Sequence, residues 1–382
     1  MSTAVYVHFP WCLQKCPYCD FASASIRRPD VPHSAYADAV LRELSWHRGR
    51  GGLGELRSVF FGGGTPSLWA ASDLGRVLAA ILNAFERHSP DLEISVECNP
   101  SSLDEAQAQA LAAVGVNRLS VGVQALDAAR LRYLGRLHDA EGALRALRSA
   151  RQAVDRVSGD LMFGTPGQPT DAFLSEVAQL VELGLSHLSV YALTIEPNTV
   201  FGELSRKGRL PLARDDDYAE TFSAVETLLA SHGFEHYEVS NYARPGQSSR
   251  HNQHYWLGGD YLGLGCAAVG CRTARPGQAQ RVRNQPNPEK YLQADGVDAL
   301  WSESETLDGQ ALVREALLLG LRTAQGVDLA FTAERAGVDP LKGRERALER
   351  QLKRGNVELT EQYLRVPRSR WLHLDSITTD LF

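Results

Sequence analysis

The stretch that decides the fold is Cys12–Ser23, "CLQKCPYCDFAS", in which three cysteines stand at the spacing C-x3-C-x2-C. A structural zinc site usually takes its ligands from two separated pairs, whereas this loop carries three thiols and no fourth. Three thiolates on one short loop suit one face of an iron–sulfur cluster, with one iron left open for an amine and a carboxylate. Zinc with His8 as its fourth ligand, and unrelated buried cysteines, are the alternatives.

The bulk composition is that of a soluble globular protein of two to three domains, with 382 residues, 43% hydrophobic and 23% charged. The net charge of −6 argues against nucleic acid as the main partner, because phosphate binding favours a basic surface. The sequence has no apolar run of the ~20 residues that a membrane span needs and no apparent secretory leader, so we expect a cytoplasmic protein. In that reducing compartment a tight cysteine group indicates metal binding or redox chemistry rather than disulfides.

Apolar, β-rich runs alternate with amphipathic segments through the first two-thirds of the chain. The expected strands are residues 4–9, 58–62, 92–98, 118–123, 159–164, 187–193 and 236–242. The expected helices are 34–47, 72–85, 102–114 and 215–232, each of which opens with Ser or Asp as an N-cap. This alternation predicts an α/β fold with a parallel sheet, and six or seven units favour a partial (β/α)6-type barrel over a doubly wound half.

The composition changes after the predicted barrel, which we place at residues 1–245. Residues 246–300 are rich in Gly and polar residues, and 275–291 ("RPGQAQRVRNQPNPEKY") has the composition of a linker or surface excursion. Residues 301–382 show helical patterns, a turn at Gly355-Asn356 and a short strand pair. We predict a smaller C-terminal α+β domain of winged-helix type.

Polar or glycine-rich clusters follow each of the first six expected strands. They are the cysteine loop, "GGGTP" (62–66), "ECNP" (97–100), "GVQ" (122–124), "GTPGQP" (164–169) and "YALTIEPNT" (191–199). Any one of them is explained by a turn, because Gly and Pro are common after strands. Since ligands bind at the carboxyl ends of strands in βα folds, six such loops together predict one binding mouth.

The cysteine loop followed by "GGGTP" resembles the radical S-adenosylmethionine superfamily. The resemblance implies a barrel of about six βα units with a [4Fe-4S] cluster, whose open iron binds the amino and carboxylate groups of S-adenosylmethionine. "YVHFPWCLQKCPYCDF", "VECNP", "GDLMFGTPGQ" and "HNQHYWLGGDYLGLG" are similar to the oxygen-independent coproporphyrinogen oxidase group in particular. This likeness covers residues 6 to about 270, and residues 301–382 resemble the C-terminal domain of that group, which we call HemN-like.

The resemblance assigns site residues one by one. Cys12, Cys16 and Cys19 would hold the cluster. The S-adenosylmethionine contacts would come from Tyr6, Tyr18, Gly63, Gly64, Thr65, Glu97, Gln124, Arg136, Asp160, Ala192 and Val269. The catalytic residues, if there are any, are not identified by the resemblance.

The group contains coproporphyrinogen III dehydrogenases and HemW-type haem chaperones, and the residue two after the third cysteine separates them. The dehydrogenases carry a fourth cysteine there, but this chain has Phe21, and it begins without the long N-terminal extension of the dehydrogenases. "RHNQHYW" (250–256) is similar to the haem-associated motif of the chaperones. His251 is the first choice as haem ligand and His254 the second, with Cys266 or Cys271 less favoured, while Tyr255 and Trp256 would cover the macrocycle.

The sequence therefore favours a haem chaperone that binds a [4Fe-4S] cluster, S-adenosylmethionine and haem, and passes haem to an acceptor protein that the sequence does not name. The rival is an enzyme of porphyrin biosynthesis, a coproporphyrinogen III dehydrogenase, which would need an electron donor to cleave S-adenosylmethionine. A zinc-stabilised binding module is the third hypothesis. Whether the chain is an enzyme is left open.

Overall fold

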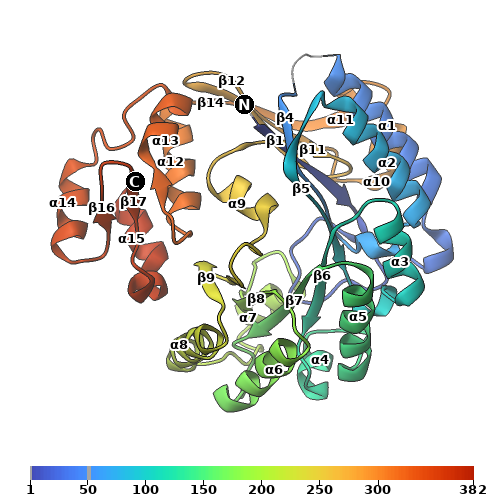
Figure 1. Ribbon diagram of the computed structural model, residues 1–382, viewed down its shortest axis with the longest axis horizontal. Coiled ribbons are helices and arrows are strands. Elements are labelled where there is room, and N and C mark those ends of the chain that lie inside the picture. The colour runs from blue at the N-terminus through green and yellow to red at the C-terminus, as the bar shows by residue number, and fades with distance from the viewer. Residues whose placement is uncertain (1, 50–52) are drawn as a thin grey trace.

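The computed structural model describes residues 2–49 and 53–382 and has a twelve-stranded sheet at its centre (Figure 1). Its middle consists of neighbouring parallel strands, and these are β1 (Ser2–Phe9), β4 (Glu55–Gly63), β5 (Arg87–Cys98), β6 (Arg118–Gln124), β7 (Arg156–Phe163) and β8 (His187–Ala192). The sheet curves into an open barrel (Figure 1). The α/β class and the six-unit partial barrel are confirmed.

Helices cover the outer side of this sheet (Figure 1). They are α1 (His33–Arg48), α2 (Ala71–Ala84), α3 (Glu105–Ala113), α5 (Ala140–Ala153), α6 (Thr170–Glu182) and α8 (Asp215–Ser231). The prediction that the opening Ser or Asp of each expected helix is its N-cap is wrong for all four. An aspartate does cap α3, but it is Asp104 rather than Ser102, while α1, α2 and α8 follow Pro32, Ala70 and Arg214.

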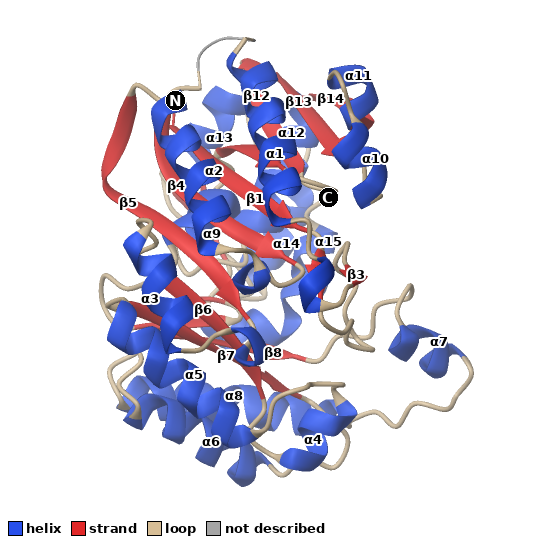
Figure 2. Ribbon diagram, turned by 90° about the vertical axis from the view of Figure 1, so that its right-hand side faces the viewer, coloured by secondary structure: helices blue, strands red, loops and turns tan. Residues whose placement is uncertain are grey.

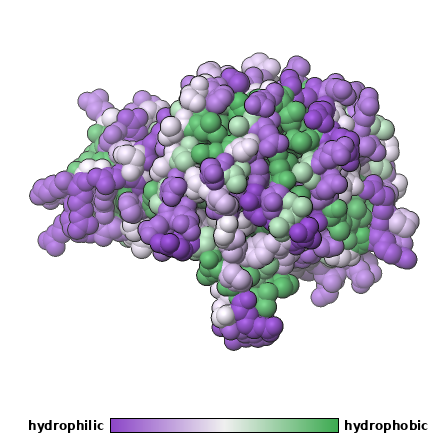
Figure 3. Space-filling model, turned by 90° about the horizontal axis from the view of Figure 1, so that it is seen from below, coloured by the Kyte–Doolittle hydropathy of each residue, from purple (hydrophilic) through white to green (hydrophobic). Residues whose placement is uncertain are grey.

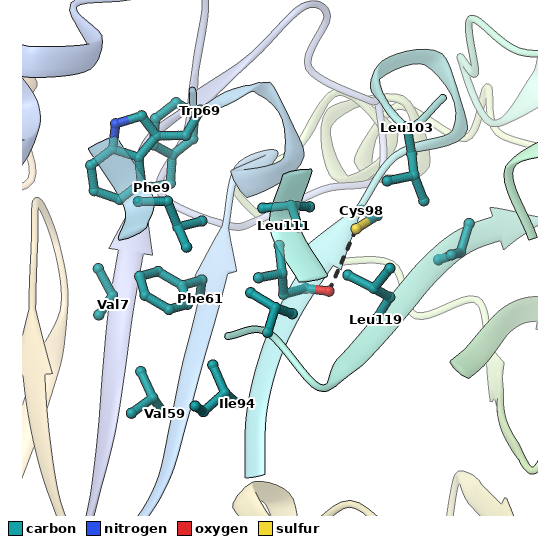
Figure 4. Packing of buried hydrophobic residues seen from close by; sticks show 14 of the residues in the cluster. Val7, Phe9, Val59, Phe61, Trp69, Ile94, Cys98, Leu103, Leu111 and Leu119 are labelled. Carbon is teal, nitrogen blue, oxygen red and sulfur yellow. Dashed lines mark hydrogen bonds between the residues drawn. The ribbon is translucent and has the colours of Figure 1, made fainter. Parts of the chain in front are cut away.

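The main core lies between the sheet and these helices, and Figure 4 shows its part around β1, β4 and β5. Phe9 and Trp69 stack with ring centroids 5.4 Å apart, and Phe61 meets the same indole edge to face. All three side chains are fully buried. Burying one such side chain contributes roughly 1.5–3 kcal/mol, so this layer holds the carboxyl ends of β1 and β4 in place.

The prediction of one continuous strand at residues 236–242 in the parallel sheet is wrong. It is a hairpin of β9 (Glu235–Glu238) and β10 (Asn241–Ala243), and β10 runs antiparallel to β8. Val239 and Ser240 form a turn that reverses the chain, although their sequence has the alternation of a strand. The parallel part of the sheet therefore ends at β8.

The prediction of a linker or surface excursion at residues 275–291 is also wrong. β11 (Asp260–Leu264) joins β1 in parallel, and β12 (Val269–Arg275), β13 (Gln278–Asn284) and β14 (Trp301–Asp308) continue the same sheet as an antiparallel meander. Pro276-Gly277 is the tight turn between β12 and β13, which explains the linker-like composition. The short helices α10 (Pro288–Gln293) and α11 (Val297–Leu300) precede β14.

The C-terminal part forms a separate lobe with its own core (Figure 1). It contains α12 (Gly309–Gly320), α13 (Leu329–Ala336), α14 (Glu345–Lys353) and α15 (Leu374–Asp380), with a small sheet of β15 (Val327–Asp328), β17 (Tyr363–Arg365) and β16 (Glu358–Leu359). Seen from below, this lobe is hydrophilic over most of its outer surface (Figure 3). The smaller C-terminal domain is confirmed, while the exact domain boundaries stay a prediction.

The remaining elements lie around the mouth of the barrel. They are β2 (Trp11–Cys12), β3 (Ala24–Ser25), α4 (Ala128–Tyr133), α7 (Val200–Arg206) and α9 (Arg250–Trp256). α7 stands away from the body on an excursion after β8 (Figure 2), and α9 lies between the barrel and the C-terminal lobe (Figure 1). No helix within residues 2–49 and 53–382 is long and apolar enough to cross a membrane.

Candidate functional site

A cavity of about 1180 Å³ lies inside the curve of the sheet. Its walls are the inward-facing side chains of the parallel strands, the cysteine loop, α9 and part of β12 and β13. Side chains that point inward alternate along each strand, which is why polar residues two apart reach the same space. The inward residues are Tyr6, His8, Phe60, Glu97, Arg118, Ser120, Gly122, Gln124, Asp160, Met162, Ser189 and Tyr191. Every residue that the sequence assigns to the cluster, to S-adenosylmethionine or to haem lines this cavity, with the exception of His254 and of the less favoured Cys266 and Cys271.

The three predicted cluster cysteines lie on one partly exposed loop at the mouth of the cavity. The Cys19 N–H donates to the Cys16 carbonyl at 3.2 Å, which makes a tight turn between these two thiols. Burial raises the pKa of Cys12, and it raises that of Cys19 to about 11. A bound iron cluster would counter this effect, because its positive irons favour the thiolate.

The loop is not closed around a metal. Within the described part of the chain, no three His, Cys, Asp or Glu side chains stand together as a preformed ion site. The donor set nevertheless fits a cluster held by three thiolates, since all three cysteines border one open space and each of Cys12 and Cys19 feels the charge of Cys16. Their role as cluster ligands stays a prediction.

Arg136 provides positive charge beside this loop. Its Nη1 lies 3.5 Å from Cys16 Sγ, and its Nη2 donates to the Gly122 carbonyl at 2.7 Å. Its Nε is buried and has no hydrogen-bond partner within residues 2–49 and 53–382. A guanidinium with a spare donor suits a carboxylate, and its role in binding S-adenosylmethionine stays a prediction.

The glycines of "GGGTP" are required by close packing at the end of β4. Gly63 has φ +106°, and a Cβ at that position would lie 2.5 Å from the His8 ring. A Cβ on Gly64 would lie 2.6 Å from the Trp11 carbonyl oxygen. The N–H groups of Gly64 and Thr65 donate to Phe9 and Trp11 at 2.7 and 2.8 Å, and they hold the start of the cysteine loop against β4. The glycine run thus fixes the loop as well as lining the cavity.

Two half-buried carboxyl groups, Glu97 and Asp160, line the cavity. Glu97 accepts from the Gly63 N–H at 3.1 Å, while Asp160 accepts from Ser120 and Ser158, each at 3.2 Å. Burial, together with the charge of Asp160, raises the pKa of Glu97 to about 7. Burial also raises the pKa of Asp160. These acceptors suit hydroxyl groups of a ligand, and the assignment of Glu97 and Asp160 to S-adenosylmethionine stays a prediction.

Gln124 is held in an unusual conformation at the end of β6. It has φ +67°, which is uncommon for a residue with a side chain, and its Oε1 accepts from the Tyr191 hydroxyl at 2.6 Å. Such strain persists where the surroundings determine the conformation, and it is frequent at binding sites. Ala192 and Val269 line the same cavity, while Tyr18 lies beside the cysteines.

The predicted haem segment forms the short helix α9. Its two candidate histidines lie in different surroundings. His251 points to the cavity, where its ring stacks on Phe60 at 4.8 Å and its Nδ1 pairs with Ser58 Oγ at 2.9 Å. Burial lowers the pKa of His251 to about 3, so its imidazole is neutral at physiological pH. His254 points away, with its Nε2 paired to the Asp260 carbonyl at 2.8 Å. The structure therefore favours His251 over His254, and both assignments stay predictions.

Glu93 is an important residue that the sequence does not reveal. It is fully buried and accepts from the N–H groups of Arg250 and His251 at 3.0 Å each. Arg156 pairs with it at 2.8 Å, and Arg118 lies 4.0 Å away. Burial opposes its ionised form, but these cations and N–H groups outweigh burial and lower its pKa. Because its partners lie far away in the chain, only the fold shows that Glu93 holds the start of α9.

Comparisons with known proteins agree with this site. Residues 6–180 match the family model of the radical SAM superfamily, and residues 307–373 match that of the HemN C-terminal domain. The chain is 38% identical over 299 residues to the heme chaperone HemW of Escherichia coli, covering 76% of this chain and 75% of that protein. The chain belongs to the radical SAM superfamily, in its HemW-like branch.

Other relatives support this membership. Identity to the heme chaperone HemW of Synechocystis is 36% over 341 residues, 86% of this chain and 80% of that one. Identity to the mouse mitochondrial radical S-adenosyl methionine domain-containing protein 1 is 39% over 337 residues, which cover 85% of this chain and 74% of that protein. The structure of the coproporphyrinogen III oxidase HemN from Escherichia coli superposes with a TM-score of 0.81 at 22% identity, covering all of this chain and 89% of that one. That likeness shows the fold alone.

Membership in the HemW-like branch of the radical SAM superfamily implies a [4Fe-4S] cluster and S-adenosylmethionine. In this chain Cys12, Cys16 and Cys19 are the residues that would hold the cluster, and its open iron would make the sulfonium of S-adenosylmethionine available for reduction. Arg136, Glu97 and the end of β4 would position the nucleotide beside it. The structure brings these groups to one cavity, as the sequence predicts.

Proposed function

We propose that this protein is a haem chaperone, which binds haem in the cavity beside a [4Fe-4S] cluster and S-adenosylmethionine and transfers it to an acceptor protein in the cytoplasm. The observation that carries the proposal is the position of His251. A neutral, buried imidazole borders the same cavity as the three thiols, and neutral imidazole is a standard axial ligand of haem iron. The relatives named heme chaperone HemW support the same reading.

Phe21 favours a chaperone over a dehydrogenase. Its side chain lines the cavity and is 53% exposed, at the position where the dehydrogenases carry a fourth cysteine. A phenyl ring neither binds a metal nor relays a proton as a thiol does. Coproporphyrinogen III dehydrogenation is the second candidate, because the fold is shared with the HemN oxidase.

Two assays on the anaerobically reconstituted protein test the proposal. Haem titration should give a saturable Soret shift with about one haem per chain, as expected for a ligated iron. Incubation with coproporphyrinogen III, S-adenosylmethionine and a reductant should give no protoporphyrinogen. Conversion at many turnovers would show the enzyme instead, and an absent Soret shift would exclude haem binding.

A further inference from the structure

We propose that Arg322 and the indole N–H of Trp256 form a subsite for a carboxylate of the bound tetrapyrrole, that is, for a haem propionate. The inference rests on the proposed haem binding and adds to it what holds the edge of the macrocycle. It assigns a ligand-binding role to the C-terminal lobe, since Arg322 follows α12.

Arg322 stands where the lobe meets the barrel. Its carbonyl accepts from the Val239 N–H at 3.0 Å, and the Ala324 N–H donates to Tyr237 at the same distance. The guanidinium lies 5.1 Å from the centre of the Trp256 ring, and both side chains line the cavity. The backbone contacts fix the arginine, so its side chain reaches the end of α9 from the opposite wall.

The two side chains have hydrogen-bond donors without acceptors. The Arg322 Nε and the Trp256 Nε1 are buried and unpartnered among the described residues. The distance from Arg322 Nη2 to Glu238 Oε1 is 3.5 Å, which is long for an ion pair. The Glu238 carboxylate also accepts a hydrogen bond from Asn241. A buried donor without an acceptor is unfavourable, and a carboxylate bound at these two groups would satisfy both.

The other cations of the cavity are less suited to this role. Arg281 is held by Glu305 and Glu315, and Arg118 lies next to Glu93. Arg283 also has an Nε without a partner among the described residues, but its guanidinium lies 3.6 Å from Glu303. Arg322 lies over the Trp256 ring of α9.

The positions of Arg322 and Trp256 relative to His251 suit binding of a single ligand by all three residues. His251 and Trp256 are both on α9 and both line the cavity, so a macrocycle bound by His251 would share this space with the aromatic residues of the helix. Its apolar face would lie near Tyr255 and Trp256, and its propionate edge would meet Arg322. A fork of N–H groups beside an aromatic ring matches a ligand that is apolar except at its carboxylates.

Haem and haem dimethyl ester separate this subsite from iron ligation, because they share iron and ring and differ only in the propionates. Soret titration of the wild type should show about tenfold tighter binding of the free acid. Arg322→Ala should weaken haem binding by about tenfold and leave the diester unchanged, so the preference is lost. Arg346→Ala, an exposed arginine of α14, is the matched control and should keep the preference.

A second variant covers the case in which Arg322→Ala does not fold. Trp256→Phe keeps an aromatic ring and removes the N–H, and it should reduce the preference by roughly threefold. Full retention of the preference in the variant that folds would overturn the proposal. If the wild type binds haem and its diester equally well, the subsite is excluded while haem binding stands. If the wild type binds neither, the proposed function itself fails.

Discussion

The cysteine loop and α9 border the same cavity but are held in different ways. The loop is partly exposed, and its contacts include Lys15 Nζ to the Phe21 carbonyl at 2.9 Å and Arg136 Nη1 to Cys16 Sγ at 3.5 Å. α9 is fixed by Glu93, and its His251 ring is packed and paired before any ligand arrives. The comparison teaches that the three thiols lie on a partly exposed loop beside open space, whereas the imidazole side chain is packed and hydrogen-bonded within the protein.

The largest expected effect is on the loop. Cys16→Ser should abolish cluster assembly, seen as loss of iron and of the absorbance near ~400 nm after reconstitution. The free energy of unfolding of the metal-free protein should change by less than about 0.5 kcal/mol, because the side chain is only partly buried.

The control for Cys16→Ser is Cys266→Ala, since Cys266 is a buried cysteine outside the loop. This variant should keep its iron and lose about 1 kcal/mol of stability. A cluster that still assembles in Cys16→Ser would contradict the assignment of the loop.

On α9 the expected effect is on stability. Glu93→Gln removes the charge that Arg156 and Arg118 face in the interior, and leaving buried cations uncompensated costs about 3–5 kcal/mol. Urea unfolding measures this loss. Glu141→Gln removes an exposed ion pair with Arg145 and should cost no more than about 0.5 kcal/mol. Equal stability of the two variants would show that Glu93 does not hold α9.

A smaller effect concerns Glu97, which lies between the two regions. Its pKa of about 7 is above that of an unfolded glutamate, so the folded state keeps a proton that the unfolded state releases. Stability of the protein without ligand should therefore fall as pH rises from about 4.5 to about 7, by up to ~3 kcal/mol from this group. Glu97→Gln should remove this contribution, as thermal unfolding across that pH range would reveal. An unchanged pH profile in the variant would contradict the raised pKa.

The sequence predicts much of this architecture because the local signals agree with the fold. Apolar strands, amphipathic helices and the cysteine spacing lead to a six-unit barrel, and the polar strand ends lead to one cavity. The meander at β12 and β13 is missed because its Pro-Gly turn has the composition of a linker. Residues that act through partners distant in the chain are also missed. Glu93 and Arg322 gain their importance from contacts that only the folded chain creates.

The account is tested most directly by haem titration of His251→Ala and His254→Ala, followed at the Soret band. The two histidines are three residues apart on α9, but only His251 borders the cavity, while His254 pairs with the Asp260 carbonyl. We predict that His251→Ala loses the Soret shift of the ligated iron and that His254→Ala retains it at a similar affinity. An unchanged Soret shift in His251→Ala, or its loss in His254→Ala alone, would contradict the placement of haem in the cavity.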